Sequence, residues 1–173
     1  MSTLDIEGLN AGDDAGVVEA LSPLFEGAPR FLARLAGIRP YRDWSSLFAA
    51  ARTIAHAMPE DEQIELIDAH PRLGAPPGSV SVLSFREQGY DRQRSAAGDG
   101  VGVAAELNGL NLAYEARFGF RYCVAVAGRP RAALLPAMAA ALSADRDAEL
   151  HRALDAVVDI AMARLDALRA SDG

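Results

Sequence analysis

The stretch of sequence that decides the fold is DWSSLFAAARTIAHAM, residues 43–58. Its apolar side chains recur at intervals of three and four residues, which places them along one face of an α-helix: Trp44, Leu47, Phe48, Ala51, Ile54, Ala55 and Met58. Helical spacing continues along most of the chain. Ala, the residue with the highest helix propensity, accounts for 35 of the 173 residues. We therefore expect an all-α protein, built as a single helical bundle.

Helix-start signals lie on both sides of this stretch. Upstream, we expect a helix over about residues 14–21, after which Ser22-Pro23 has the pattern of an N-cap and first position of the next helix. Downstream, Pro59 and the three acids that follow it predict the first turn of a helix that ends near Ala69.

The middle of the chain reads as two loops around a short helix. Residues 73–79, LGAPPGS, cannot continue a helix because proline lacks the amide donor and glycine is entropically costly there. The spacing Ser84-x-x-Glu87 is that of a capping box and predicts a helix through Gln88. Residues 95–102 are small and polar, and they indicate a second surface loop.

The second half of the chain predicts more helices and one ambiguous run. Apolar spacing over residues 103–118 predicts a helix that Gly119 ends. A helix broken or started at Pro136 follows, and then a long helix over about residues 150–168. Residues 120–126, FRYCVAV, have strand composition, but no partner strand is visible, so an extended segment or a helix is at least as compatible.

Composition limits the classes of function. The 24 acidic and 17 basic residues give a net charge of −7, which disfavours a nucleic-acid partner. All the basic residues are Arg, and without Lys the chain has no Schiff-base, pyridoxal-phosphate or P-loop chemistry. One Cys excludes an intrachain disulfide and Cys-rich metal sites. Without a signal-like or membrane-length apolar run, we expect a soluble cytoplasmic domain over residues 1–173, flexible over 1–12.

Few residues are candidates for chemistry. His70 stands at a helix end before a proline and a loop, which suits either a functional group or a helix cap. His56 and His151 lie on predicted helices and are better explained as structural. Glu87 is explained equally well by the capping box, and Gln88 by exposure to solvent.

Two further residues have a plain structural explanation. Arg117 has a fork suited to a carboxylate, although a surface ion pair explains it as well. Cys123 lies in an apolar run, where a small core residue is the simplest interpretation. No GxSxG elbow anchors a Ser-His-Asp triad.

Three ordered blocks resemble a known enzyme family. They are AHPRLG at residues 69–74, S-x-x-EQ at 84–88 and LN-x-x-N-x-x-Y-x-x-RFGF at 107–120. In order and spacing they are similar to the 2-oxo-4-hydroxy-4-carboxy-5-ureidoimidazoline (OHCU) decarboxylases of uric acid breakdown. Shorter matches at residues 21–23, 39–41 and 160–165 extend the resemblance over nearly the whole chain.

The resemblance implies an all-helical homodimer that needs no metal or organic cofactor. It implies His70 as the catalytic acid/base and Glu87 as the carboxylate that orients it. Residues that line the substrate pocket would be Pro71, Ser84, Phe85, Arg86 and Gln88, together with the backbone of Tyr122, Cys123, Val124, Ala125 and Val126. This assignment makes residues 122–126 an extended segment without a sheet.

The chain departs from the family pattern at three points. One is the altered glycine-containing segment after the EQ pair, GYDRQ at residues 89–93. Arg121 follows the FGF sequence where the family usually has Pro, and Ala127 stands where the family usually has Arg two residues before the position of Arg129. These changes affect the expected pocket rim, so Arg117 and Arg121 are additional candidates there.

The implied reaction is decarboxylation of OHCU to (S)-allantoin, with His70 moving the hydroxyl proton to the neighbouring carbon. The substrate supplies its own electron sink, a ring C=N bond beside the carboxylate-bearing carbon. Two alternatives stay open from the sequence. One is decarboxylation of a related hydroxy- or ureido-carboxylate, suggested by Arg121. The other is a non-catalytic helical protein that binds a purine-derived ligand or a partner protein.

Overall fold

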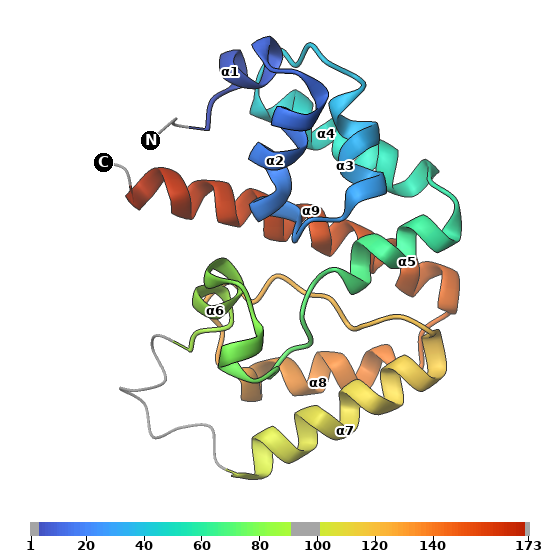
Figure 1. Ribbon diagram of the computed structural model, residues 1–173. Helices are drawn as coiled ribbons and strands as arrows, with labels where there is room; N and C mark the ends of the chain where they lie inside the picture. Colours follow the sequence, from blue (N-terminus) through green and yellow to red (C-terminus); the bar gives the residue numbers. More distant parts are fainter. Residues whose placement is uncertain (1–3, 91–100, 172–173) are drawn as a thin grey trace.

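The computed structural model describes residues 4–90 and 101–171, and within these ranges every regular element is a helix (Figure 1). The prediction of an all-α fold is confirmed. The elements are α1 (Ile6–Ala11), α2 (Asp14–Phe25), α3 (Pro29–Ala36), α4 (Trp44–Ala57), α5 (Glu60–Asp68), the 3₁₀ turn η1 (Pro77–Ser79), α6 (Val82–Glu87), α7 (Val101–Phe118), α8 (Arg131–Ala141) and α9 (Arg146–Ser171).

Helix α9 is the axis around which the other elements are arranged. It packs against α2, α4 and α5, while α7 and α8 pair with each other. Figure 1 shows α9 crossing between the group α1–α4 and the pair α7–α8, with α5 and α6 at the boundary. An apolar cluster runs through both parts, from Leu9 in α1 to Leu165 in α9. The long final helix therefore ties together segments from both ends of the sequence.

The predicted stripe on residues 43–58 is the buried face of α4. Leu47, Phe48, Ala51 and Ala55 are buried, and Asp43 caps the helix by accepting a hydrogen bond from the Ser46 N–H at 2.7 Å. The predictions for α5, α7 and α9 are also confirmed within a few residues. Residues 120–126 form no strand and run in an extended path between α7 and α8.

Two prolines do not interrupt helices as the sequence suggested. Ser22-Pro23 lies inside α2, and Pro136 lies inside α8, so both predicted breaks are wrong. In α2 the helix continues because Leu21, Leu24 and Phe25 all bury against the core. Burial of that face outweighs the loss of one amide donor.

The helix boundaries differ at three more places. Ser81 rather than Ser84 caps α6, so the predicted capping box of Ser84 with Glu87 is wrong. Residues 6–11, expected to be flexible, form α1, because Asp5 caps the helix and Leu9 buries against the core. The predicted loop 73–79 contains the turn η1. The predicted loop 95–102 lies mostly outside the described residues, and its last two residues begin α7.

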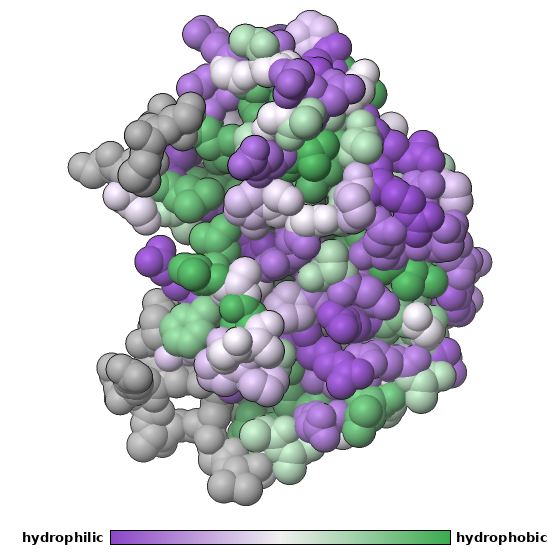
Figure 2. Space-filling model, in the orientation of Figure 1, coloured by the Kyte–Doolittle hydropathy of each residue, from purple (hydrophilic) through white to green (hydrophobic). Residues whose placement is uncertain are grey.

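The surface is unevenly polar. In Figure 2, hydrophilic residues gather on the side of this face where α3 and α5 lie, and apolar residues are more frequent on the opposite side. Ion pairs join α3 to α5, including Arg30 with Asp61 at 2.6 Å and Arg34 with Glu62 at 2.7 Å. Across the described parts of the chain, none of the helices combines the length and apolarity that a membrane crossing requires.

Candidate active site

His70 lies just beyond the C-terminal end of α5 and is buried, with 4% of its surface exposed. Its Nδ1 lies 3.2 Å from the carbonyl oxygen of Leu66, one helical turn earlier. A carbonyl oxygen only accepts hydrogen bonds, so the Nδ1–H donates and the neutral ring carries its proton there. Nε2 is buried and has no hydrogen-bond partner among the residues that the structure describes. The ring therefore presents an unused lone pair.

The surroundings of His70 favour its neutral form. Burial, the largest influence, and the positive charge of Arg164 both lower the pKa of the imidazole, which is about 4 in the folded protein. The bond to Leu66 and the charge of Glu26 act in the opposite direction, but they are weaker. At neutral pH the ring is thus uncharged, and its Nε2 is a base rather than a proton donor.

A small cavity of about 20 Å³ borders His70. That volume holds about one water molecule. The cavity is walled by the loop after α5, by α6, by the extended segment and by α9. Its lining residues are His70, Pro71, Leu73, Ser84, Glu87, Gln88, Tyr122, Cys123, Val124, Ile160 and Arg164.

Arg164 of α9 organises the polar side of this cavity and is 3% exposed. Its Nη2 donates to Glu87 Oε2 at 3.0 Å and to Ser84 Oγ at 2.8 Å, and it lies 2.9 Å from Glu26 Oε1. Its Nη1 donates to the Pro23 carbonyl at 3.0 Å. One guanidinium thus holds together the end of α2, helix α6 and α9, beside His70.

The two carboxyl groups that contact Arg164 differ in their pKa. For Glu87, burial is the largest influence and raises the pKa above its ordinary value, despite the opposing effect of Arg164. For Glu26, burial alone would also raise the pKa, but hydrogen bonds from Ser84 and Ser81 and the charge of Arg164 together lower it. Glu26 therefore stays ionised more readily than Glu87.

The extended segment after α7 forms the wall opposite α6. Arg152 of α9 donates to the Cys123 carbonyl at 2.9 Å and lies over the Tyr122 ring. The Glu149 carboxylate accepts a hydrogen bond from Arg152 Nε at 2.8 Å and another from the Tyr114 hydroxyl at 2.6 Å. Burial raises the pKa of the Cys123 thiol to about 12, so Cys123 is a core residue and not a nucleophile.

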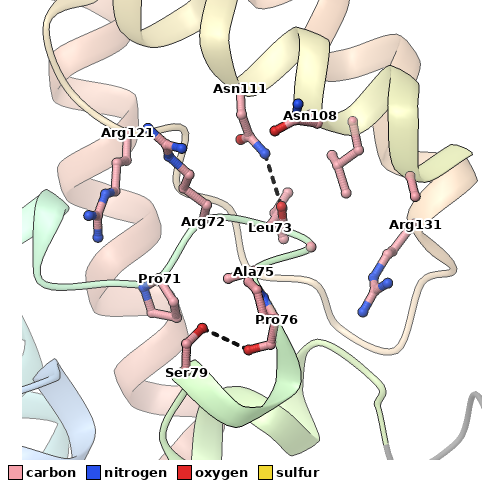
Figure 3. A pocket seen from close by; sticks show the side chains of 13 residues that line it. Pro71, Arg72, Leu73, Ala75, Pro76, Ser79, Asn108, Asn111, Arg121 and Arg131 are labelled. Carbon is pink, nitrogen blue, oxygen red and sulfur yellow. Dashed lines mark hydrogen bonds between the residues drawn. The ribbon is translucent and has the colours of Figure 1, made fainter.

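The loop 71–76 is fixed from two sides. The amide of Gln88 donates to the Arg72 carbonyl at 3.1 Å and accepts the Gly74 N–H at 2.9 Å. From α7, the Asn111 amide donates to the Leu73 carbonyl at 2.9 Å (Figure 3). The alternative that Gln88 is a solvated residue is therefore wrong, because both ends of its amide hold the loop that follows His70.

A second pocket of about 340 Å³ adjoins the cavity and shares Pro71 and Leu73 with it. Figure 3 shows Asn108 and Asn111 on one side of this pocket, and Arg131 set apart from Arg72 and Arg121. Since the arginine side chains do not converge, we assign no ligand to this pocket.

The structure gathers most of the residues that the sequence singled out. His70, Pro71, Ser84, Glu87, Gln88, Tyr122, Cys123 and Val124 all line the cavity. Four others do not line it: Phe85, which packs on Tyr90, the exposed Arg86, and Ala125 and Val126 farther along the segment.

The candidate arginines of the rim have structural contacts instead. Arg117 is exposed and donates to the Ala144 carbonyl at 3.0 Å. Arg121 Nη1 donates to the carbonyls of Asp68 at 2.7 Å and His70 at 3.0 Å, so it fastens the end of α5. Ala127 has a positive φ of 51° in the turn after the segment. Neither arginine lines the His70 cavity.

One expected contact is absent. Glu87 does not hydrogen-bond His70: its partner is Arg164, while the His70 ring is oriented by the Leu66 carbonyl. The prediction that Glu87 orients His70 directly is therefore wrong. Sequence reasoning also missed the parts played by Arg164 and Glu26. The sequence signal that could have identified Arg164 is its charge on the apolar face of the last helix, between Ile160 and Leu165.

Over residues 4–90 and 101–171, no group of three or more His, Cys, Asp or Glu side chains is placed to hold a metal ion.

Comparison with known proteins gives a consistent result. Residues 10–166 match the protein family described as OHCU decarboxylase. The chain is 33% identical over 168 residues to the uric acid degradation bifunctional protein PucL of Bacillus subtilis, covering 95% of the chain but 32% of that protein. It is 31% identical to the putative 2-oxo-4-hydroxy-4-carboxy-5-ureidoimidazoline decarboxylase of Homo sapiens, covering 96% of the chain and 97% of that protein.

The fold has solved relatives as well. The crystal structure of an OHCU decarboxylase in the presence of (S)-allantoin superposes with a TM-score of 0.68 at 22% identity. The match covers 91% of this chain and 98% of the solved one. The helical arrangement is thus one already seen in crystals.

Proposed function

Because the chain belongs to the OHCU decarboxylase family, we propose that it is a carboxy-lyase that converts 2-oxo-4-hydroxy-4-carboxy-5-ureidoimidazoline to (S)-allantoin in urate degradation. The observation that carries the proposal is His70. Its ring is neutral, its Nδ1–H is committed to Leu66, and its Nε2 is buried and unpartnered beside a polar cavity. A buried base of this kind suits removal of a hydroxyl proton.

The chemistry needs no electron sink from the protein. The carboxylate of the substrate sits on a ring carbon that also bears a hydroxyl group and adjoins a ring C=N bond. When carbon dioxide leaves, the electron pair of the broken bond forms a C=C bond between the two ring carbons. The π electrons of the C=N bond move to the ring nitrogen, which gains one proton from outside the substrate. His70 Nε2 takes the hydroxyl proton and returns a proton to the carbon that bears the ureido group. Such general acid–base catalysis typically contributes ~10²- to 10⁴-fold.

The remaining residues have supporting parts in this proposal. Arg164 supplies positive charge and Glu87 supplies hydrogen bonds to the polar groups of the substrate, and Ser84 holds Arg164 in place. Gln88 acts as a positioning residue through the loop after His70. The backbone of residues 122–124 forms the opposite wall, so that protonation from one face gives one enantiomer.

Substrate entry requires the cavity to widen. Its volume of about 20 Å³ is far below the ~300 Å³ typical of small-molecule sites. The wall formed by α6 is the best candidate to move, because α6 is only six residues long and packs less extensively on other helices than α2, α4 or α5 do on α9.

The proposal includes an assembly and a location. The enzyme acts as a homodimer of single-domain chains, each spanning residues 1–173, in the cytoplasm and without a metal or organic cofactor. Exposed apolar side chains such as Val82 of α6 and Leu112 of α7 are available to a partner subunit. Light scattering should give a mass near twice 18.3 kDa. A monomeric mass at micromolar concentration would refute the dimer.

The alternative of a related hydroxy- or ureido-carboxylate rested on Arg121. Because Arg121 fastens the end of α5 and lies outside the cavity, it gives no reason for a different substrate. OHCU is therefore the substrate to test first.

The test is to feed freshly generated OHCU to the protein and to follow circular dichroism as the product forms. We expect rapid formation of optically active (S)-allantoin, unchanged after exhaustive chelation and dialysis. Racemic product at the uncatalysed rate would refute the proposed activity. Loss of activity that a divalent metal restores would refute the cofactor-free reaction.

A further inference from the structure

The proposed reaction assigns no role to the carboxylate of Glu26. It follows the last residue of α2, in a left-handed backbone conformation with φ of 54°, and its side chain is largely enclosed, with 14% exposed. Its Oε1 accepts hydrogen bonds from Ser84 Oγ and, at 2.7 Å, from Ser81 Oγ. Arg164 Nη2 lies 2.9 Å from the same oxygen. Three donors therefore converge on one carboxylate oxygen.

The count of charges around Arg164 is uneven. One guanidinium faces two carboxyl groups, Glu26 and Glu87, and one neutral imidazole, His70. A single positive charge balances only one negative charge. The geometry favours ionised Glu26, because it accepts two hydroxyl donors in addition to Arg164, whereas among the described residues only Arg164 donates to Glu87.

We propose that Glu26 is the permanent counter-ion of Arg164, and that it thereby leaves Glu87 as the carboxyl group that carries a proton in the cavity. Glu26 is then a positioning residue, since it acts through Arg164 and does not line the cavity. This inference rests on the proposed function for its chemical consequence, but the charge arrangement itself does not.

The consequence concerns the proton that decarboxylation consumes. Loss of carbon dioxide from a carboxylate requires one proton from outside the substrate. The C–C bond to the carboxylate breaks, and its electron pair forms a C=C bond between the two ring carbons. The π electrons of the ring C=N bond move to the nitrogen, which gains a proton. Protonated Glu87 donates that proton, becomes a carboxylate beside Arg164, and regains a proton from solvent. His70 separately moves the hydroxyl proton to carbon, so the two groups have different tasks.

The charged and titratable neighbours are consistent with this division. Those that face Glu26 are Arg164 from α9 and His70 after α5; those that face Glu87 are Arg164, Glu26 and the Cys123 thiol of the extended segment. The negative charge of Glu26 raises the pKa of Glu87 and also that of His70. Removing that charge should therefore lower both values.

The first experiment titrates the wild-type protein, and two single variants serve only to assign its glutamate signals. The side-chain carboxyl carbons of glutamate are labelled with ¹³C, assigned by the single variants Glu26→Gln and Glu87→Gln, and titrated by NMR. We expect Glu26 to titrate below the ordinary range of glutamate and Glu87 above it. The reverse order would overturn the proposal.

The second experiment repeats the titration in Glu26→Gln, which keeps the shape of the side chain. The Glu87 midpoint should fall by about 1 pH unit, since Glu87 becomes the only carboxylate on Arg164. If OHCU is turned over, the pH at which kcat declines on the alkaline side should fall with it. The matched control is Glu149→Gln, the same change at the buried carboxylate that pairs with Arg152 of α9, which should lower Tm without moving the Glu87 midpoint.

The outcomes separate this inference from the proposed function. A Glu87 midpoint unchanged in folded Glu26→Gln overturns the counter-ion inference even if the enzyme makes (S)-allantoin. Shifted midpoints in a protein that does not turn over OHCU support the counter-ion and refute the activity. If Glu26→Gln does not fold, the order of the two midpoints in the wild-type protein decides.

Discussion

Two arginines of α9, the partly exposed Arg152 and the buried Arg164, each pair with buried or half-buried carboxyl groups but differ in their charge balance. Arg152 pairs with one carboxylate, Glu149, which also accepts the Tyr114 hydroxyl. Arg164 contacts two carboxyl groups, and an imidazole with an unused nitrogen lies nearby. The first group is neutral and its contacts hold the cavity wall. The second has one carboxyl group more than its positive charge requires.

This difference distinguishes a group with a structural role from a group suited to acid–base chemistry. A balanced group has no reason to exchange protons, and burial together with Glu149 raises the pKa of Tyr114 well above its ordinary value. In the unbalanced group, burial moves the pKa of Glu87 up and that of His70 down, so burial favours the uncharged form of both groups. Pairs of this kind are typical of acid–base sites.

The largest expected effect is that of His70→Asn on the rate. Asn can still donate to the Leu66 carbonyl, so the fold should be retained, but the base at Nε2 is lost. We expect the rate of (S)-allantoin formation to fall by about 10²- to 10⁴-fold. His151→Asn, on the exposed surface of α9, is the control and should retain the wild-type rate. A folded His70→Asn protein with near wild-type activity would contradict the mechanism.

The next largest expected effect is on the pH dependence of the free energy of unfolding. The folded pKa of His70 is about 4, below its ordinary value of 6.5, so the unfolded chain binds the proton more tightly between these values. The stability that neutral His70 confers is complete above pH 6.5 and is lost as pH falls to 4, by about 3 kcal/mol.

Chemical denaturation of the wild-type protein and His70→Asn at several pH values isolates this contribution, because the two proteins share all other titratable groups. The difference in unfolding free energy between the two proteins should change by that amount between pH 6.5 and 4. A constant difference would mean that His70 titrates near its ordinary pKa in the folded protein.

Replacing glutamate by glutamine should have different effects in the two arginine groups. Glu149→Gln leaves Arg152 without its carboxylate and should cost about 2 kcal/mol of stability, with the rate of the folded enzyme close to wild type. Glu87→Gln mimics the protonated carboxyl group that burial favours, so it should cost little stability and much of the rate. Denaturant melts and product assays on both variants test this. If both variants lose mainly stability, the comparison fails.

The smallest effect is expected at a third arginine group, on the surface. Arg52 of α4 pairs with Asp155 and Asp159 of α9, and these side chains are 35–52% exposed. Asp159→Asn should change the unfolding free energy by at most about 1 kcal/mol and leave the rate unchanged. A larger loss would show that exposure alone does not separate structural from weak ion pairs here.

The sequence predicted the helices whose apolar periodicity is strong. Residues 43–58 and the long last helix alternate apolar and polar faces, and tertiary packing uses the same faces. The breaks at Pro23 and Pro136 were predicted wrongly because local rules for proline neglect what burial gains on either side. Only packing against other helices, which a local pattern does not contain, decides such cases.

The site was predictable in part for a similar reason. His70 and Glu87 were found through ordered motifs, and both line the same cavity. The pattern Ser84-x-x-Glu87 fits a capping box and equally fits two side chains one turn apart that face Arg164. Glu26 and Arg164 lie near opposite ends of the chain, and nothing local in the sequence indicates that they meet.

The most direct test of the account is the protonation state of His70 in the wild-type protein, measured from the ¹⁵N chemical shifts of its imidazole. At pH 7 the account predicts a neutral ring with the proton on Nδ1 and a bare Nε2, persisting until the pH approaches 4. An imidazolium at pH 7, or a neutral ring with the proton on Nε2, would contradict it.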